Sequence, residues 1–216
     1  MGVDPDGAEI EHTLLSNLQM EELQSSDGHW STVLKISWED FESIFKPLAK
    51  QTKQSPHVVL KVYSSKAVMF WYYNLECEPF SFRYPELSVE ENFHKASMWE
   101  YQNEVSAYQR IEEYNDSHQD NKINAPKLFQ HGYCCIELRS GALIEGMFLA
   151  MEYLPFVNNK DSIDKTGIVE KLKSIGISHD DLHTRNMCVD ENGETYIYDF
   201  GSVVIDSHLT NSETTI

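Results

Sequence analysis

The segment from Gly176 to Gly201 constrains the fold of this chain more than any other part of the sequence. It concentrates polar side chains that often carry chemistry, namely His179, Asp180, Asp181, His183, Asn186 and Asp199. Asn192 and Gly193 stand between two short β-type runs, so a tight hairpin is predicted to return the chain beside the loop at Asp181. Two interpretations are open at this point: a catalytic site, or an ordinary polar loop followed by a hairpin.

The chain before this segment alternates predicted strands and helices. Strands are predicted at 29–36 and 57–65, with a short helix from Ser37 to about residue 52 between them. A long helix is predicted at 88–114, where Ser88 and Glu91 have capping-box spacing. Two further strands, 127–139 and 143–154, form a hairpin through Ser140 and Gly141, and a helix at 168–176 is expected to end at Gly176.

These elements predict an α+β fold with an antiparallel sheet. Residues 1–28 are expected to form a flexible acidic leader. Residues 29–154 are expected to form the lobe that holds the sheet, and residues 155–216 a minimal second lobe. The aromatic run at 66–85 has no clear secondary-structure pattern.

Charge and cysteine content restrict the partners and the compartment. With 35 acidic and 17 basic side chains, the net charge of -18 would repel a nucleic-acid backbone, so no nucleic-acid partner is expected. The four cysteines show neither a CxxC pair nor a zinc spacing, which favours a reducing compartment. We find no signal peptide and no membrane span, so a cytoplasmic or nuclear protein without a membrane partner is expected.

The order of the predicted elements and motifs resembles the protein-kinase-like superfamily, whose catalytic loop reads HxDxxxxN and whose metal-binding triplet is DFG. Here the loop is His179, Asp181 and Asn186, and the triplet begins at Asp199. The form HDDLHTRN is similar to the HxDLHxxN loop of aminoglycoside and choline phosphotransferases and of small atypical kinases. The resemblance implies a two-lobed fold with an antiparallel-sheet N-lobe and a minimal C-lobe.

The resemblance also implies an ATP- and Mg²⁺-dependent phosphotransferase that acts on an alcohol group of an unknown acceptor, either a small molecule or a protein. Phosphoryl transfer depends on positioning and on charge neutralisation. Asp181 would face the acceptor hydroxyl, and Asn186 and Asp199 would hold the magnesium ion. His179 is interpreted as a core histidine that fixes the loop, whereas a phosphate-binding role and a local hydrogen bond are both open for His183.

The nucleotide-binding residues implied by the resemblance lie further upstream. Lys61 resembles the strand lysine that binds the α- and β-phosphates, although an exposed strand lysine is the alternative. Its implied partner is Glu104 on the long helix, with Glu100 and Glu91 as rivals. The segment of Met151, Glu152 and Leu154 resembles the strand and hinge that bind adenine.

Three departures from the family pattern shape the alternatives. No GxGxxG loop precedes Lys61, where Gly28 is the only nearby glycine, and Asp180 replaces the arginine of conventional protein kinases. Only 15 residues follow Gly201, which leaves little chain for a substrate platform. A truncated sequence, a partner protein that completes the C-lobe and a catalytically weak descendant are the explanations that stay open.

Two other functions compete with the phosphotransferase. A kinase-like pseudoenzyme would act as a nucleotide-binding or protein-binding scaffold, which the missing glycine loop and the short C-lobe favour. A metal-dependent hydrolase would use the His and Asp cluster directly, but that cluster has no zinc-ligand spacing.

Overall fold

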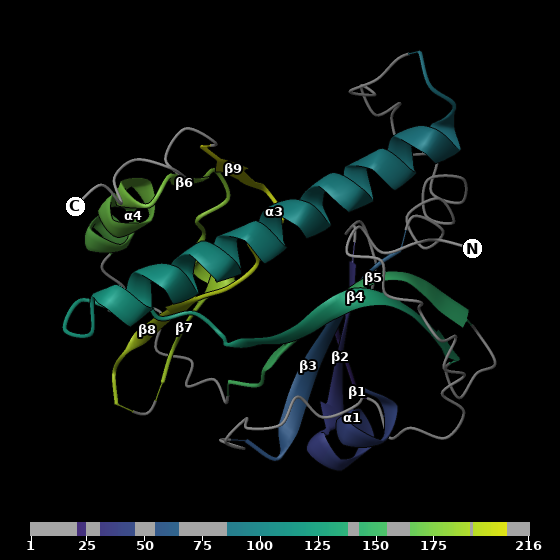
Figure 1. Ribbon diagram of the computed structural model, residues 1–216, viewed down its shortest axis with the longest axis horizontal. Helices are drawn as coiled ribbons and strands as arrows, with labels where there is room; N and C mark the ends of the chain where they lie inside the picture. Colours follow the sequence, from purple (N-terminus) through teal and green to yellow (C-terminus); the bar gives the residue numbers. More distant parts are fainter. Residues whose placement is uncertain are drawn as a thin grey trace, which may run out of the picture. The chain divides into compact units, whose positions relative to one another are not determined.

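The computed structural model describes residues 21–24, 31–45, 55–64, 86–137, 143–154, 165–190 and 192–206 (Figure 1). They divide into two compact units. Unit 1 contains the chain up to Tyr101 and Leu128–Tyr153, and unit 2 contains Gln102–Lys127 and the chain from Leu154 onward. Several predictions lie outside the described residues: the leader up to residue 20, the loop at Gly28, the aromatic run 66–85, the hairpin turn at 140–141 and the linker 155–164.

Unit 1 is built on an antiparallel five-stranded sheet, which confirms the predicted α+β class. The strands lie in the order β1-β2-β3-β5-β4. Their bounds are β1 Glu21–Gln24, β2 Ser31–Ser37, β3 His57–Tyr63, β4 Leu128–Glu137 and β5 Leu143–Glu152. Strand β1 falls inside the segment predicted as leader, because residues 21–24 pair with β2.

Alternating side chains of these strands form the core of unit 1. Leu34 and Ile36 of β2, Leu60 of β3 and Phe148 of β5 are all buried in one hydrophobic cluster. Helix α1 (Trp38–Ile44) adds aromatic rings to this cluster, and Phe41 lies 5.5 Å from the ring of Trp38. The Ser37 hydroxyl accepts a hydrogen bond from the Asp40 backbone N–H at 2.9 Å, as the predicted N-cap requires.

Helix α3 (Val89–Ser117) begins with the predicted capping box. The Ser88 backbone N–H donates to the Glu91 carboxylate at 2.9 Å, and the Glu91 backbone N–H donates to the Ser88 hydroxyl at 3.2 Å. The predicted apolar face is buried at four of its five positions, namely Tyr101, Val105, Tyr108 and Ile111, and partly buried at Met98. Figure 1 shows the helix as one continuous element, although its residues divide between the two units after Tyr101.

Unit 2 consists of short elements around the His/Asp/Asn loop. They are α4 Lys165–Ser174, β6 Ile177–His179, the 3₁₀ turn η2 Thr184–Asn186, β7 Met187–Val189, β8 Thr195–Ile197 and β9 Val203–Ile205. Strand β6 pairs with β9 and β7 pairs with β8, both antiparallel. Helix α4 begins three residues before its predicted start. Two glycines have a left-handed backbone conformation at the predicted positions: Gly176 (φ 72°) follows the end of α4, and Gly193 (φ 84°) lies in the turn of the β7–β8 hairpin.

The second half of α3 belongs to unit 2 because its polar side chains bind backbone groups there. The Asn103 side-chain amide donates to the Val203 carbonyl at 2.9 Å. Arg110 donates to the carbonyls of Ile175 at 3.1 Å and Asp206 at 2.8 Å. Residues 102–127, which the predicted boundary assigns to the N-lobe, are therefore grouped with the loop of Asp181.

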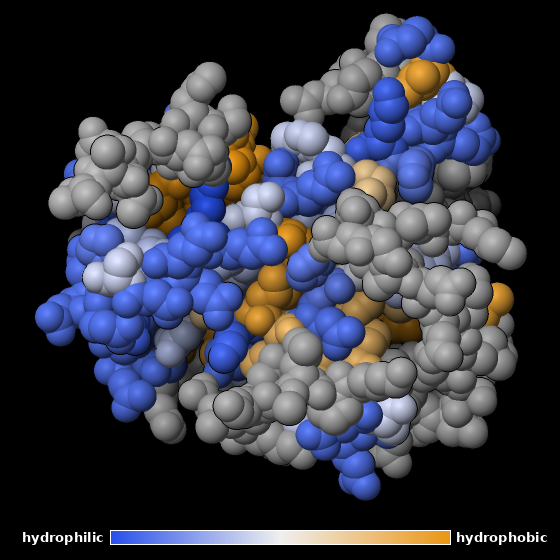
Figure 2. Space-filling view, in the orientation of Figure 1, coloured by the Kyte–Doolittle hydropathy of each residue, from blue (hydrophilic) through white to orange (hydrophobic). Residues whose placement is uncertain are grey.

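Figure 2 shows hydrophilic residues over much of the face in view. Leu143 (60% exposed) and Val204 (53% exposed) are the large apolar side chains that are well exposed in the described ranges. Of the helices in those ranges, none has the length and apolar character of a membrane span.

Candidate active site

The loop after β6 is fixed by its own backbone and by one amide side chain. The His183 backbone N–H donates to the Asp181 carbonyl at 2.8 Å, and the Asn186 backbone N–H donates to the His183 carbonyl at 2.9 Å. The Asn186 side-chain amide also donates to the Asp181 carbonyl, at 2.9 Å. These three bonds make residues 181–186 a tight turn that leads directly into β7.

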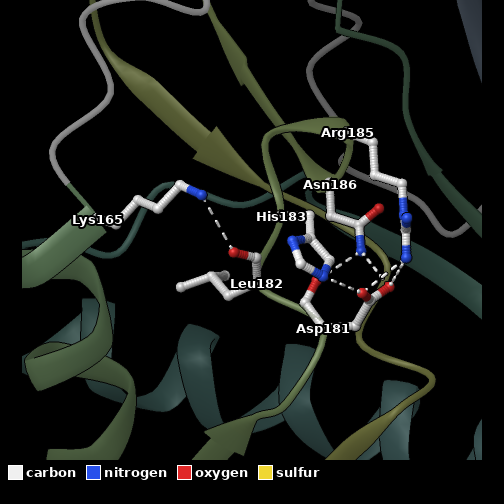
Figure 3. Close-up of polar contacts among 6 residues, drawn as sticks. All are labelled: Lys165, Asp181, Leu182, His183, Arg185 and Asn186. Atoms are coloured by element: carbon white, nitrogen blue, oxygen red, sulfur yellow. Dashed lines mark hydrogen bonds and ion pairs between the residues drawn. The ribbon is translucent and has the colours of Figure 1, made fainter.

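The Asp181 carboxylate lies at the centre of a set of donors from this turn (Figure 3). Arg185 Nη2 contacts Oδ1 at 2.7 Å and Oδ2 at 2.8 Å. Asn186 Nδ2 donates to Oδ2 at 3.1 Å, and His183 Nε2 lies 3.2 Å from Oδ1. The Asp181 side chain is 29% exposed, so part of the carboxylate still faces solvent.

These contacts determine the charge of the loop. Partial burial raises the pKa of Asp181, but hydrogen bonds from Arg185 and Asn186 and the charge of Arg185 together hold it below its ordinary value. The same hydrogen bond raises the pKa of Arg185. Asp181 is therefore an ionised hydrogen-bond acceptor at neutral pH, which suits the orientation of a hydroxyl group better than strong general-base catalysis.

The sequence leaves two environments open for Arg185, solvent or the γ-phosphate of a nucleotide, with solvent preferred, and it predicts no contact with Asp181. The Arg185 side chain is 66% exposed, yet one of its nitrogens contacts both carboxylate oxygens. A sequence signal was present, since Asp and Arg four residues apart often interact on a helical turn. His183 is also well exposed, and its 3.2 Å contact with Asp181 agrees with the local hydrogen bond that was one of its two open roles.

Asn186 connects this loop to the segment that carries Asp199. Its side chain is buried, and Figure 3 shows the amide nitrogen turned toward Asp181. Its backbone carbonyl accepts a hydrogen bond from the Tyr198 backbone N–H at 3.1 Å. The structure thus brings Asp181, Asn186 and the residue before Asp199 into one hydrogen-bonded site.

Asp199 has a left-handed backbone conformation, with a φ of 65°. It is the only described residue other than glycine with a positive φ. Such a conformation costs a non-glycine residue roughly 1–2 kcal/mol, although Asp and Asn tolerate it better than most. Strain of this kind occurs at functional sites, where the surrounding structure holds it in place.

Phe200, the residue after Asp199, packs against two ring side chains. Its side chain is completely buried, and its ring lies 5.1 Å from Tyr108 in an edge-on arrangement and 5.5 Å from His179. The negative charge of Asp199 also helps to raise the pKa of Arg185, so Asp199 acts electrostatically on the loop. The second predicted metal ligand therefore lies in the electrostatic environment of Asp181 and Asn186.

His179 has the architectural environment that the sequence predicts. Both ring nitrogens are buried. Burial lowers the pKa of His179. The charges of Asp199, Asp181 and Asp180 and an interaction with the Asp199 backbone raise it, but the effect of burial is larger. The ring is thus a neutral packing surface for Phe200.

Lys61 lies in the middle of β3 in unit 1, opposite Val33 and Leu149 of the neighbouring strands. The side chain is only 6% exposed, so the alternative of an exposed strand lysine is wrong. Its ammonium group lies 5.1 Å from the centre of the Tyr63 ring. A buried ammonium group of this kind requires compensating contacts.

The remaining predicted nucleotide residues fall on both units. Met151 and Glu152 are the last residues of β5 in unit 1, and they pair with Val59 and Val58 of β3. Leu154 is the first residue of the second chain segment that belongs to unit 2. Met151 is buried and the other two are half-buried. Their role in binding adenine stays a prediction.

Glu104 is completely buried on the part of α3 that belongs to unit 2. Its rival Glu91 caps the helix through Ser88, and Glu100 is half-buried. Because Lys61 and Glu104 belong to separately described units, their pairing stays a prediction from the sequence.

The donor chemistry of the site fits magnesium better than zinc. Within the described ranges, no group of three or more His, Cys, Asp and Glu residues is arranged to hold a metal ion. Asn186 and Asp199 offer an amide oxygen and a carboxylate. Mg²⁺ is typically bound by one or two such oxygen ligands, with water and substrate phosphates completing its shell.

Comparisons with known proteins give a distant structural likeness. No protein-family model and no curated protein matches the sequence. The chain is similar to WbdD, a bifunctional kinase-methyltransferase, with 21% identity and a TM-score of 0.38 over 70% of this chain and 29% of that one. A 2.2 Å structure of WbdD has 21% sequence identity and a TM-score of 0.38, and the match covers 73% of this chain and 32% of WbdD. For monomeric WbdD the identity is 20% and the TM-score 0.40, with 68% of this chain and 31% of WbdD covered. The chain thus spans about a third of WbdD, and its function is inferred from its own residues.

Proposed function

We propose that this chain is an ATP- and Mg²⁺-dependent phosphotransferase of the protein-kinase-like superfamily that acts on an alcohol group. The observation that carries the proposal is the hydrogen-bonded connection between Asp181, Asn186 and the segment before Asp199. An ordinary polar loop has no need to bring a carboxylate, a buried amide and a strained second aspartate together.

Asp181 orients the acceptor in this proposal. Its partly exposed carboxylate accepts a hydrogen bond from the acceptor hydroxyl, whose oxygen forms a bond to the γ-phosphorus of ATP. The bond between that phosphorus and the bridging oxygen of the β-phosphate breaks, ADP leaves, and the hydroxyl proton passes to Asp181. A carboxylate of lowered pKa suffices, because little nucleophile activation is needed in a loose phosphoryl-transfer transition state.

Asn186 and Asp199 are the proposed magnesium ligands. The bound ion would neutralise the phosphate charges that build up during transfer. On the protein side, Phe200 follows Asp199 and packs against Tyr108, and the Asn186 amide nitrogen is occupied by Asp181, which leaves the amide oxygen for the metal.

Lys61 is assigned to the nucleotide phosphates, with Glu104 as its counter-charge. Burial of both side chains supports an electrostatic role, since a buried charge without a partner is strongly destabilising. Met151, Glu152 and Leu154 are assigned to adenine binding. A partner protein that completes the C-lobe is a further part of the proposal, and the described elements after the loop are the short strands β7, β8 and β9.

Magnesium-dependent nucleotide binding tests the proposal. We expect ATP with Mg²⁺, at about a hundredfold over its dissociation constant, to stabilise the chain by about 2.7 kcal/mol. For a chain of this size this raises the melting temperature by about 5–10 °C. Isothermal titration of Asp199→Asn, which tolerates the left-handed backbone but removes the charge, should show affinity at least about tenfold weaker.

Two controls separate the outcomes. Lys61→Met should weaken ATP binding with or without magnesium, whereas Lys173→Met, which removes an exposed charge from α4, should bind ATP as the unsubstituted chain does. No stabilisation by millimolar ATP and Mg²⁺ contradicts the proposal. Stabilisation without any consumption of ATP supports the scaffold alternative instead.

A further inference from the structure

Arg185 contacts Asp181 in an unusual way for so exposed a side chain. A single nitrogen, Nη2, lies 2.7 Å from one carboxylate oxygen and 2.8 Å from the other. Asn186 and His183 each contact one oxygen only, at 3.1 and 3.2 Å. Among the donors that the structure describes around this carboxylate, Arg185 is thus the one that fixes both oxygens together.

The backbone of Arg185 is itself held in place by the segment that leads to Asp199. The Tyr198 hydroxyl donates to the Arg185 carbonyl at 2.5 Å, and the Tyr198 backbone N–H donates to the Asn186 carbonyl at 3.1 Å. The guanidinium is therefore attached to a turn that is held at two successive residues.

We propose that Arg185 is a positioning residue, which holds both oxygens of the Asp181 carboxylate so that its exposed side meets the acceptor hydroxyl. The inference rests on the proposed phosphotransferase function. Without Arg185, the carboxylate would keep only the longer contacts of Asn186 with Oδ2 at 3.1 Å and of His183 with Oδ1 at 3.2 Å, so its orientation would be less tightly fixed. A displacement of about 1 Å in such a group can reduce a rate by about a hundredfold.

Kinetics of the full chain test this role, with ADP formation from ATP and Mg²⁺ as the readout and water as the acceptor. We expect Arg185→Met to lower kcat by about tenfold to a hundredfold and to leave KM for ATP within about twofold. Arg185→Lys should restore part of kcat, since one nitrogen serves both oxygens and an ammonium group can replace it. In an Asp181→Asn background, Arg185→Met should cause no further loss, because Arg185 acts through Asp181.

Three results would overturn the inference. A kcat of Arg185→Met equal to that of the Lys173→Met control shows that the contact does not matter for turnover. A raised KM for ATP with unchanged kcat shows that Arg185 binds a phosphate instead of positioning Asp181. Additive losses in the Asp181→Asn background show that Arg185 acts independently. Absence of turnover in the unsubstituted chain overturns the proposed function together with this inference, whereas each of the three results overturns the inference alone.

Discussion

At the scale of single residues, the site combines a strained aspartate with a histidine that packs as an apolar ring. Asp199 has a φ of 65°, where glycine would be unstrained, and backbone strain of this kind is often found at functional sites. His179 lies against Phe200, the residue after Asp199, and both of its ring nitrogens are buried. The two residues therefore have distinct roles, although the sequence places them in one polar cluster.

The half-buried His179, whose ring nitrogens are both buried, predicts that the stability of the chain depends on pH. Its pKa is lowered in the folded state relative to about 6.5 when unfolded, so the unfolded state binds more protons as the pH falls. The free energy of unfolding should thus decrease as the pH falls below about 7, by at most about 1.4 kcal/mol per pH unit from this residue. Denaturant titrations between pH 7.5 and 5.5 measure this slope.

A substituted chain assigns the slope to His179. His179→Phe keeps an aromatic ring against Phe200 and removes two buried nitrogens, so it should be as stable as the unsubstituted chain at pH 7.5 and should lose part of the slope. The exposed His94 on α3 provides the control, since His94→Gln should leave the slope unchanged. An identical slope in His179→Phe would show that other groups cause it.

At the scale of elements, a close approach between β3 and β5 leaves no space for a side chain at Gly146. A Cβ atom there would lie 1.9 Å from the Tyr63 carbonyl oxygen and 3.2 Å from the Ser64 Cα. Because both neighbours are backbone atoms, the strands would have to move apart. We expect Gly146→Ala to lower the free energy of unfolding by about 3 kcal/mol, at the upper end of typical overpacking costs.

Chemical denaturation with a second glycine variant checks this expectation. Gly193 has a left-handed φ but open space around it, so Gly193→Ala should cost only about 1–2 kcal/mol, from backbone strain alone. A Gly146→Ala chain as stable as Gly193→Ala, or more stable, would mean that β3 and β5 separate easily at this point. The position of Lys61, two residues before Tyr63 on β3, would then be less rigid than the paired register implies.

At the scale of the whole molecule, local signals in the sequence predicted most elements and long-range contacts account for the differences. Helix caps at Ser37 and Ser88 and the glycine turns at Gly176 and Gly193 act over a few residues, so they could be read correctly. The pairing of residues 21–24 with β2 and the assignment of the second half of α3 to unit 2 depend on partners far along the chain.

The same distinction applies to the candidate site. Asp181, Asn186 and Asp199 could be selected because their spacing resembles a family motif. Two hydrogen bonds were not predicted, from Arg185 to the Asp181 carboxylate and from the Tyr198 hydroxyl to the Arg185 carbonyl. The first depends on the direction of a side chain, and the second on how the β7–β8 hairpin brings Tyr198 back beside the loop. The pairing of Lys61 with Glu104 and the binding of adenine stay predictions.

Magnesium-dependent turnover tests the central claim most directly. The chain would be incubated with ATP and Mg²⁺, with water as the acceptor, and ADP formation would be compared in the unsubstituted chain, Asp181→Asn, Asp199→Asn and Lys173→Met. The account predicts ADP formation that requires magnesium, persists in Lys173→Met and falls at least about a hundredfold in both aspartate variants. No ADP formation by the unsubstituted chain under saturating ATP, or equal formation by the aspartate variants, would contradict it.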